Sequence, residues 1–289
     1  MRAYVSLLVS GLFLSCSSVS AQPVTGQVPD GAQPPRYSLV IVEGMTTIRR
    51  LQQQFGPEGY ADLLRLNRVD AEHVRQGDAL VVPDRLLDAV AICPFPRQLA
   101  ADLCPSEKLL LVSRRVQAFG AYENGVLVRW GPTSTGRMET PTPAGLFYTN
   151  WRTKSRRSND NDEWVLPWYV NFINESGVSF HQFALPGYPA SHACVRLLAA
   201  DAHWIYDWAD SWVLSKNGRE VLLEGTPVLV FGDYDYAAPP PWRRLTNDPL
   251  ATSMRLEEIA TAMQAHVQTI AQRSAARAAW RQAGSQPVR

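Results

Sequence analysis

The sequence predicts a mainly β protein: a β-sandwich or barrel-like domain with one helix after a cysteine motif, a small α+β module before it and a C-terminal helix after it. Residues 108–233 are divided into short apolar and β-branched runs separated by Gly, Pro and Asn. Residues 37–84 begin and end with such a run but have helical spacing between them. With 289 residues, the chain is long enough for one to two domains with a sizeable core.

The strands expected in the large domain cover residues 109–113, 115–122, 126–130, 170–173, 178–181 and 225–231. Asn124 and Gly125 predict a tight hairpin turn, because this pair tolerates positive φ angles. The Gly-, Pro- and Thr-containing residues 131–136 are expected to end the preceding strand. Helical spacing over 197–212 predicts one helix, with Asp201 as a cap.

The small module reads as strand, helix, helix, strand. Residues 37–42 and 79–83 are expected to be its strands, and the turn 76–78 precedes the second of them. Thr46 and Thr47 are candidates to cap the first helix, and a second helix is expected over 61–67.

Residues 1–21 have the features of a signal peptide: Arg2 as the basic start, an apolar stretch too short to span a membrane, and small residues before Gln22. Residues 22–36 are then a flexible linker. The protein is therefore expected to be exported, to the periplasm. The alternative is a lipoprotein anchored through Cys16, a weaker interpretation because Phe and Leu rarely stand just before a lipidated cysteine.

Charge argues against nucleic acid as a partner. The chain has 28 Lys+Arg and 27 Asp+Glu, so loss of Arg2 with the signal peptide leaves 27 of each sign. A protein that binds nucleic acid normally carries a basic excess.

Three cysteines remain after export. Cys93 and Cys104 lie in the connector 85–107, on either side of a Pro-containing segment, and are predicted to form a disulfide in an oxidising compartment. On the chain-entropy model such a loop contributes about 3 kcal/mol. The alternative is that all three thiols are reduced and buried. Cys194 is then the unpaired thiol, and nucleophilic catalysis would explain it.

Residues 191–197, Ser-His-Ala-Cys-Val-Arg-Leu, place the Cys194 thiol beside His192, and His181 lies upstream. A thiol attacks a carbonyl only as the thiolate, and a neighbouring imidazole can take its proton. The alternative is that Cys194 is a small buried hydrophobe. No metal or other cofactor is expected, because no two ligands have Cys-x2-Cys or His-x3-His spacing.

The cysteine run resembles the Ser-His-Gly-Cys-x-Arg signature of the L,D-transpeptidases, the YkuD-type catalytic domains that remodel peptidoglycan. Residues 140–147 are similar to the family's Thr-Pro-x-Gly-x-Phe segment and residues 166–172 to its Pro-Tyr-Trp-Met-x-Phe segment. The resemblance implies that Cys194 forms a thioester with a tetrapeptide stem and transfers it to an acceptor amine, which cross-links the wall. With the same thiol the protein would alternatively be an L,D-carboxypeptidase or endopeptidase.

The resemblance also implies roles for the neighbours of the thiol. His181 is the expected base, oriented by the backbone carbonyl of Gln182, and His192 is expected to steady the turn or shape the oxyanion region. The N–H groups of Ala193 and Cys194 are candidates for the oxyanion hole.

Two departures from the family pattern motivate a competing interpretation, a catalytically inactive wall-binding protein. Ala193 and Gln182 stand where the family usually has Gly. Alanine disfavours positive φ, so the turn at Ala193 has either negative φ or strain.

Substrate contacts are expected from Ser191 and Arg196. For Arg196 the reason is that a planar bidentate guanidinium suits the terminal carboxylate of the substrate. The alternative for Arg196 is a structural ion pair. Residues 151–168 are expected to form a lid, or else a solvated hairpin. Three aromatic residues are expected to line the groove or pack beside it: Trp164, Trp168 and Tyr169.

Residues 37–84 resemble the LysM fold, a small peptidoglycan-binding module, on Tyr37, Gly44, Asn67 and residues 77–83. Its function would be either glycan anchoring or that of a folded spacer. Residues 234–289 are a Pro-rich linker and a helix from about 249 to 280, expected to pack on the large domain or to dock on a protein partner. The expected main partner is peptidoglycan, through its tetrapeptide stems and glycan strands.

Overall fold

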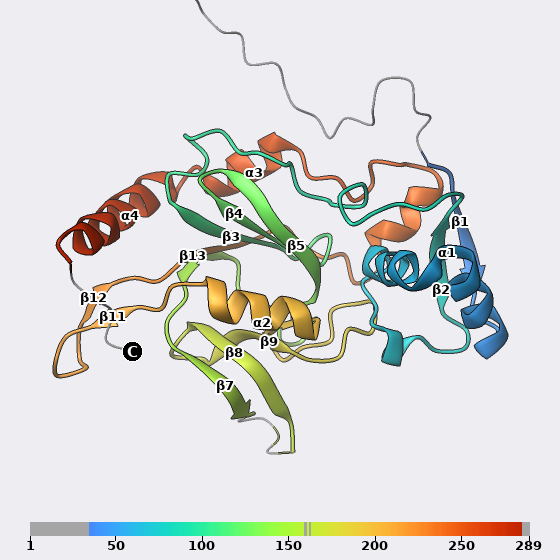
Figure 1. Ribbon diagram of the computed structural model, residues 1–289, viewed down its shortest axis with the longest axis horizontal. Helices are drawn as coiled ribbons and strands as arrows, with labels where there is room; N and C mark the ends of the chain where they lie inside the picture. The colour runs from blue at the N-terminus through green and yellow to red at the C-terminus, as the bar shows by residue number, and fades with distance from the viewer. Residues whose placement is uncertain (1–34, 159–160, 162, 285–289) are drawn as a thin grey trace, which may run out of the picture.

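The computed structural model describes residues 35–158, 161 and 163–284. The predicted signal peptide, Cys16 and nearly all of the predicted linker lie outside this range. The N-terminal module lies at one end of the molecule, the large sheet in the middle and the last helix at the other end (Figure 1). Within the described residues, none of the helices combines the length and apolar character needed to cross a bilayer.

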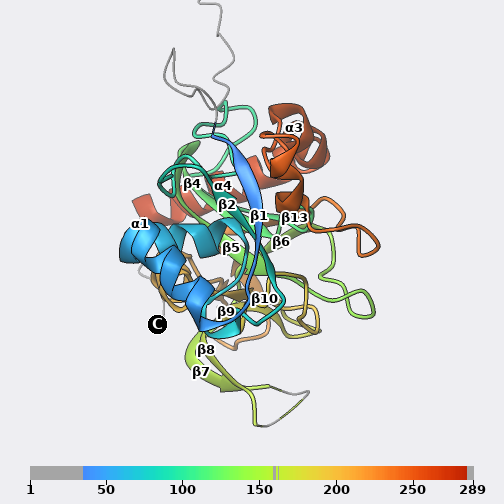
Figure 2. The same ribbon diagram turned by 90° about the vertical axis from the view of Figure 1, so that its right-hand side faces the viewer.

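The N-terminal module has the predicted strand–helix–helix–strand order (Figure 2). It consists of β1 (Tyr37–Ile41), α1 (Met45–Leu66), the 3-10 turn η1 (Ala71–His73) and β2 (Ala79–Pro83), with β1 and β2 antiparallel. Non-helical angles at Gly56, followed by Pro57, divide α1 into two helices. The predicted Thr cap is wrong: Gly44 is the N-cap, and the Thr47 hydroxyl instead accepts a hydrogen bond from the N–H of Glu43.

The large domain is built on one nine-stranded mixed sheet. Its strands are β3 (Lys108–Ser113), β4 (Ala118–Glu123), β5 (Val126–Ser134), β6 (Gly145–Tyr148), β7 (Arg152–Arg157), β8 (Val165–Ile173), β9 (Val178–Gln182), β10 (Val195–Leu197) and β13 (Pro227–Phe231). Their order is β6-β13-β3-β4-β5-β10-β9-β8-β7. The pairs β13–β3 and β10–β9 are parallel. A separate ribbon pairs β11 (Val213–Leu214) with β12 (Val221–Leu223).

The sheet curls on itself. Strand β6 is at one edge and β8 is next to the other, yet the rings of Phe147 on β6 and Phe172 on β8 lie 5.9 Å apart. The result is a half-barrel that encloses one core, covered by α2 (Ala199–Trp208). The predicted mainly β, barrel-like fold with a helix after the cysteine motif is confirmed.

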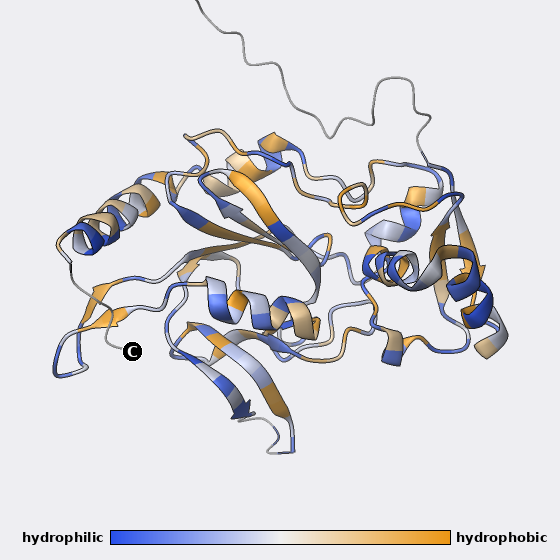
Figure 3. Cartoon of the chain, viewed as in Figure 1, coloured by the Kyte–Doolittle hydropathy of each residue, from blue (hydrophilic) through white to orange (hydrophobic). Residues whose placement is uncertain are grey.

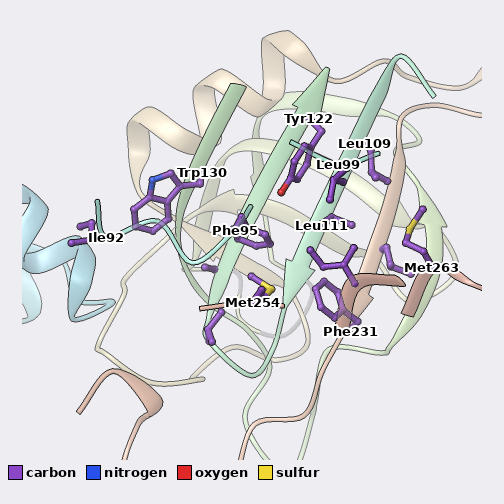
Figure 4. Close-up of a cluster of buried hydrophobic side chains, with 14 of the residues drawn as sticks. Ile92, Phe95, Leu99, Leu109, Leu111, Tyr122, Trp130, Phe231, Met254 and Met263 are labelled. Carbon is purple, nitrogen blue, oxygen red and sulfur yellow. The ribbon is translucent and has the colours of Figure 1, made fainter. Parts of the chain in front are cut away.

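A second core lies on the outer face of the sheet (Figure 4). Along β3, Leu110 and Val112 point into the half-barrel, whereas Leu109 and Leu111 point into the outer core, because side chains alternate along a strand. All four are fully buried, which explains the uninterrupted apolar run of this strand. The outer core is covered by the connector, the 3-10 turn η2 (Pro241–Thr246), α3 (Leu256–Met263) and α4 (Val267–Gln282).

Two local predictions about β5 and α2 are wrong for one physical reason. Strand β5 continues through the expected break, because Gly131 lets the strand approach Asp201: a Cβ there would lie 2.3 Å from its Oδ2. Asp201 does not cap α2, whose N-cap is Leu198, but is buried in an ion pair with Arg129 at 2.8 Å. The predicted hairpin turn at residues 124–125 is confirmed, with φ angles of 48° and 80°.

The C-terminal segment packs on the large domain, as expected, but it forms two helices instead of one. The turn between α3 and α4 redirects the chain so that Met263 and Ile270 both reach the outer core. Arg277 donates hydrogen bonds to the carbonyls of Ser211 and Glu224, which holds α4 on the domain.

The predicted disulfide is wrong, because Cys93 and Cys104 are both free thiols. The Cys93 thiol donates to the carbonyl of Phe95, and the Cys104 thiol to that of Ser106, each at 3.6 Å. Burial raises the pKa of Cys93 to about 12 and also raises the pKa of Cys104, so both groups are neutral thiols that fill the outer core.

Candidate active site

The pairing of β9 with β10 brings the two halves of the site together. In this parallel pair Val195 lies opposite Phe180 and Arg196 opposite His181. Val195 and Phe180 are fully buried in the half-barrel core, so by alternation His181, Arg196 and Cys194 face the other side of the sheet. There they line one pocket, whose walls are Ser158, Trp164, Leu166, His181, Phe183, Ser191, His192, Cys194 and Arg196.

The ring of His181 is fixed in one tautomer. Its Nδ1 lies 2.9 Å from the backbone oxygen of Gln182, the orienting contact that the family resemblance implies. A carbonyl only accepts, so Nδ1 carries the proton and Nε2 is left as a free acceptor. Burial, together with the positive charge of Arg196, lowers the pKa of His181 to about 4. The imidazole is therefore neutral near pH 7 and able to accept a proton.

Cys194 is half-buried, and two groups of the β8–β9 hairpin surround its sulfur. The Ser179 hydroxyl lies 3.5 Å from Sγ, and the thiol points to the carbonyl of Gly177 at 3.9 Å. Ser179 was not predicted as a site residue. It stands two positions before His181, so the period of two along a strand places it on the same face and could have identified it.

The turn that carries Cys194 is tied to residues 135–142. Thr142 is fully buried, and its hydroxyl accepts from the N–H of Gly136 at 2.9 Å and donates to the carbonyl of Ala193 at 2.7 Å. The N–H of Ser191 donates to the carbonyl of Thr135 at 3.0 Å. Residues 140–147 were expected only as a segment similar to the family's Thr-Pro-x-Gly-x-Phe segment, and the support that Thr142 gives to the cysteine turn was not predicted.

Ala193 has a φ of +81°, so the strained one of the two expected conformations is the one present. Glycine adopts this conformation without a Cβ clash. The Ala193→Gly variant is therefore expected to raise the free energy of unfolding by about 0.5–1 kcal/mol, net of the greater entropy loss of glycine. Chemical denaturation would measure it.

The matched control for that prediction is Ala144→Gly, at an exposed position outside the positive-φ set. This variant should lose stability instead, by up to about 1 kcal/mol. Equal losses at the two positions would mean that Ala193 is not strained.

Arg196 lines the same pocket as Cys194 and His181. Its guanidinium lies 4.6 Å from the centroid of the Phe183 ring and makes a long contact, 3.5 Å, with the carbonyl of Ala184. Both expectations for Arg196, a contact with the substrate carboxylate and a structural ion pair, stay predictions.

His192 and Trp164 form the outer wall of the pocket, with ring centroids 5.4 Å apart. Among the described residues, Nδ1 of His192 has no hydrogen-bond partner although it is buried, so ring packing holds this side chain. Ser191 also lines the pocket, and its carbonyl accepts from the N–H of Arg137. The predicted roles of Ser191, His192 and the oxyanion-hole N–H groups stay predictions.

Of the two expectations for Trp168 and Tyr169, groove lining or packing, the structure shows packing, since neither lines the pocket. Trp168 stacks on His203 of α2 at 3.9 Å, and Tyr169 is buried behind the site, stacked on Trp151, with its hydroxyl donating to the carbonyl of Gly177 at 2.7 Å. The expected lid segment forms the antiparallel hairpin β7–β8, whose outer strand β7 is hydrophilic (Figure 3). Within this hairpin Ser158, Trp164 and Leu166 reach the pocket.

The fold and the pocket define a class: a curled β-sheet domain that carries a cysteine–histidine site. Residues 107–230 match the family model described as YkuD, the L,D-transpeptidase catalytic domain. The large domain is therefore a YkuD-type L,D-transpeptidase catalytic domain. No curated protein matches the chain.

Solved structures of L,D-transpeptidases are similar to this chain at low identity. One from Xylanimonas cellulosilytica is 23% identical, with a TM-score of 0.42, over 69% of this chain and 100% of that one. L,D-transpeptidase 1 of Mycobacterium tuberculosis is 21% identical, with a TM-score of 0.34, over 44% and 63%. This chain spans less than two thirds of three such structures: 59% of LdtMt1 in complex with imipenem, 59% of an L,D-transpeptidase from Mycobacterium smegmatis and the 63% given above for L,D-transpeptidase 1.

Proposed function

We propose that the protein is a peptidoglycan L,D-transpeptidase in which Cys194 is the nucleophile and His181 is its general base. The observation that carries this proposal is the fixed tautomer of His181. Its Nδ1 is held by the carbonyl of Gln182, which leaves Nε2 as the acceptor of the ring, and His181 lines the same pocket as Cys194. The family of the domain supplies the substrate class.

In the first half-reaction the thiol proton moves to Nε2 of His181 and Sγ attacks the carbonyl carbon of the third residue of a tetrapeptide stem. The N–H groups of Ala193 and Cys194 would stabilise the oxyanion. The C–N bond to the terminal D-Ala then breaks, the imidazolium returns its proton to the leaving amine, and a thioester to Cys194 remains.

In the second half-reaction the amine of another stem attacks the thioester, His181 takes up the amine proton, and the thiol is regenerated as the cross-link forms. If water is the acceptor, the product is a tripeptide stem and the protein acts as a carboxypeptidase. If the donor is a 3→3 cross-link, the same step makes it an endopeptidase. All three outcomes use the same two residues and differ only in the donor or the acceptor.

The setting of this reaction is part of the proposal. Export through residues 1–21 would place the enzyme in the periplasm, with lipidation of Cys16 as the alternative. Glycan binding by the N-terminal module would raise the local concentration of enzyme on the wall. A protein partner for the C-terminal helices remains a prediction.

Incubation of the purified mature protein with disaccharide-tetrapeptides, followed by mass spectrometry, tests the proposal. We expect release of D-Ala together with cross-linked dimers, and neither product from the Cys194→Ala variant. Tripeptide monomers without dimers would make the protein a carboxypeptidase. If the folded, reduced protein gives no product from tetrapeptides or 3→3 dimers, the proposal is wrong and a wall-binding role replaces it.

A further inference from the structure

The segment between His181 and Cys194 lies against the N-terminal module. One oxygen of the Asp70 carboxylate, Oδ2, accepts a hydrogen bond from the N–H of Leu185 at 2.7 Å. The other, Oδ1, accepts from the N–H groups of Glu72 and His73, both at 3.0 Å, and lies 2.6 Å from Nδ1 of His73. A single side chain thus caps a turn of the module and holds the segment that joins the two reacting residues.

Backbone contacts extend this attachment over three consecutive residues. The N–H of Asp70 donates to the carbonyl of Leu185 at 3.0 Å, and Val69 forms a β-bridge with Pro186. A Cβ added at Gly187 would lie 3.6 Å from the carbonyl oxygen of Asn67. Residues 67–70 of the module and residues 185–187 of the large domain therefore pack as closely as neighbouring strands.

The module is itself fixed on the large domain. Arg68 is fully buried, and its Nε donates to the carbonyl of Val116 at 2.9 Å. Its guanidinium lies 5.6 Å from the ring centroid of Trp130 and 5.5 Å from that of Trp242. Because Arg68 is anchored in this way, Asp70 two residues later is a rigid support and not a mobile one.

The other side of the same segment supports the reacting groups. The carbonyl of Gln182 orients His181, Phe183 carries the guanidinium of Arg196, and the carbonyl of Ala184 lies 3.5 Å from it. A shift of the segment at Leu185 would therefore move the contacts that set the ring of His181 and the direction of Arg196.

We infer that Asp70 is a positioning residue of the active site, acting through Leu185, and that the N-terminal module is a structural part of the catalytic centre and not only a wall anchor. Asp70 touches no reacting atom. This inference rests on the proposed function and deepens it.

The Asp70→Ser variant tests the inference. Serine is a good helix N-cap, so it keeps an acceptor for the turn η1, but it lacks the second oxygen that reaches Leu185. The matched control is Asp78→Ser, whose carboxylate accepts from the N–H of Arg75 within the same module. Each variant loses one carboxylate of the module, and only the first loses the contact with the segment.

Two quantities would be measured at a temperature well below both melting transitions: the rate of Cys194 acylation by a carbapenem, and amide hydrogen exchange in residues 183–193. We expect Asp70→Ser to acylate about tenfold more slowly and to exchange faster in this segment. We expect Asp78→Ser to match the wild type in both, even if its melting temperature falls. If the module only added stability, Asp70→Ser and Asp78→Ser would have the same acylation rate and the same exchange in residues 183–193.

The inference is overturned if Asp70→Ser has wild-type exchange in residues 183–193, or if both variants slow acylation equally. If the wild type does not react with the carbapenem, the proposed function fails. The inference is then decided by comparing Asp70→Ser with Asp78→Ser in amide exchange and in the rate at which iodoacetamide alkylates Cys194. If Asp70→Ser does not fold, Asp70→Asn takes its place in the same comparison.

Discussion

Replacing His181 with glutamine is expected to slow acylation of Cys194 by about 10²–10⁴-fold, the usual contribution of a positioned general base. Glutamine is polar and of similar size but cannot take the thiol proton. The pseudo-first-order rate of carbapenem acylation, followed by stopped-flow absorbance, measures the effect. The matched control is His203→Gln, because His203 is a half-exposed histidine that stacks on Trp168 outside the pocket. Similar rates for the two variants would remove His181 from the mechanism.

The same substitution has a consequence for stability. The folded pKa of His181, about 4, lies below its ordinary value of 6.5, so the unfolded chain binds the proton first as pH falls. Stability should therefore decline as pH falls from 6.5 to 4, by up to about 3 kcal/mol from this group. In His181→Gln this part of the pH dependence should disappear. Urea denaturation at pH 7 and pH 4.5 measures it, and identical slopes in both proteins would contradict the assignment.

Replacing Arg196 with methionine is expected to lower kcat/KM for a donor with a free terminal carboxylate by about 10- to 100-fold, because a charge-assisted hydrogen bond to the substrate is lost. Methionine keeps the aliphatic length that packs on Phe183 but has no charge. Product formation from tetrapeptide stems gives kcat/KM directly.

The control for Arg196→Met is a donor whose terminal carboxyl is an amide. The wild type should use this donor poorly, and the variant should lose little more on it, since the interaction is already absent. Equal losses on both donors would mean that Arg196 supports the pocket wall and does not bind the carboxylate.

Sequence patterns were sufficient where a residue's surroundings follow from its own strand. Cys194, His181 and Arg196 were identified from the cysteine run 191–197 and its resemblance to the family signature. The alternation of side chains along their strands explains why the structure places them on one face. The continuous apolar run of β3 and the Asn124–Gly125 turn are equally local.

The failures concern surroundings that distant segments provide. For the adjacent aromatics Trp168 and Tyr169, the sequence left groove lining and packing both open, and the positions of α2 and of Trp151 decide for packing. Spacing alone could not show that Cys93 and Cys104 each bond to a nearby carbonyl. The hold of Asp70 on Leu185 spans 115 residues, so no local pattern could reveal it.

The central claim is that Cys194 is an activated thiol that forms an acyl-enzyme. Intact-mass spectrometry of the purified protein after incubation with a carbapenem, beside the Cys194→Ala variant, tests it most directly. We predict one adduct per chain on the wild type and none on the variant, although both retain Cys93 and Cys104. An unmodified wild type that is folded and reduced, or an adduct that persists in the variant, would contradict it.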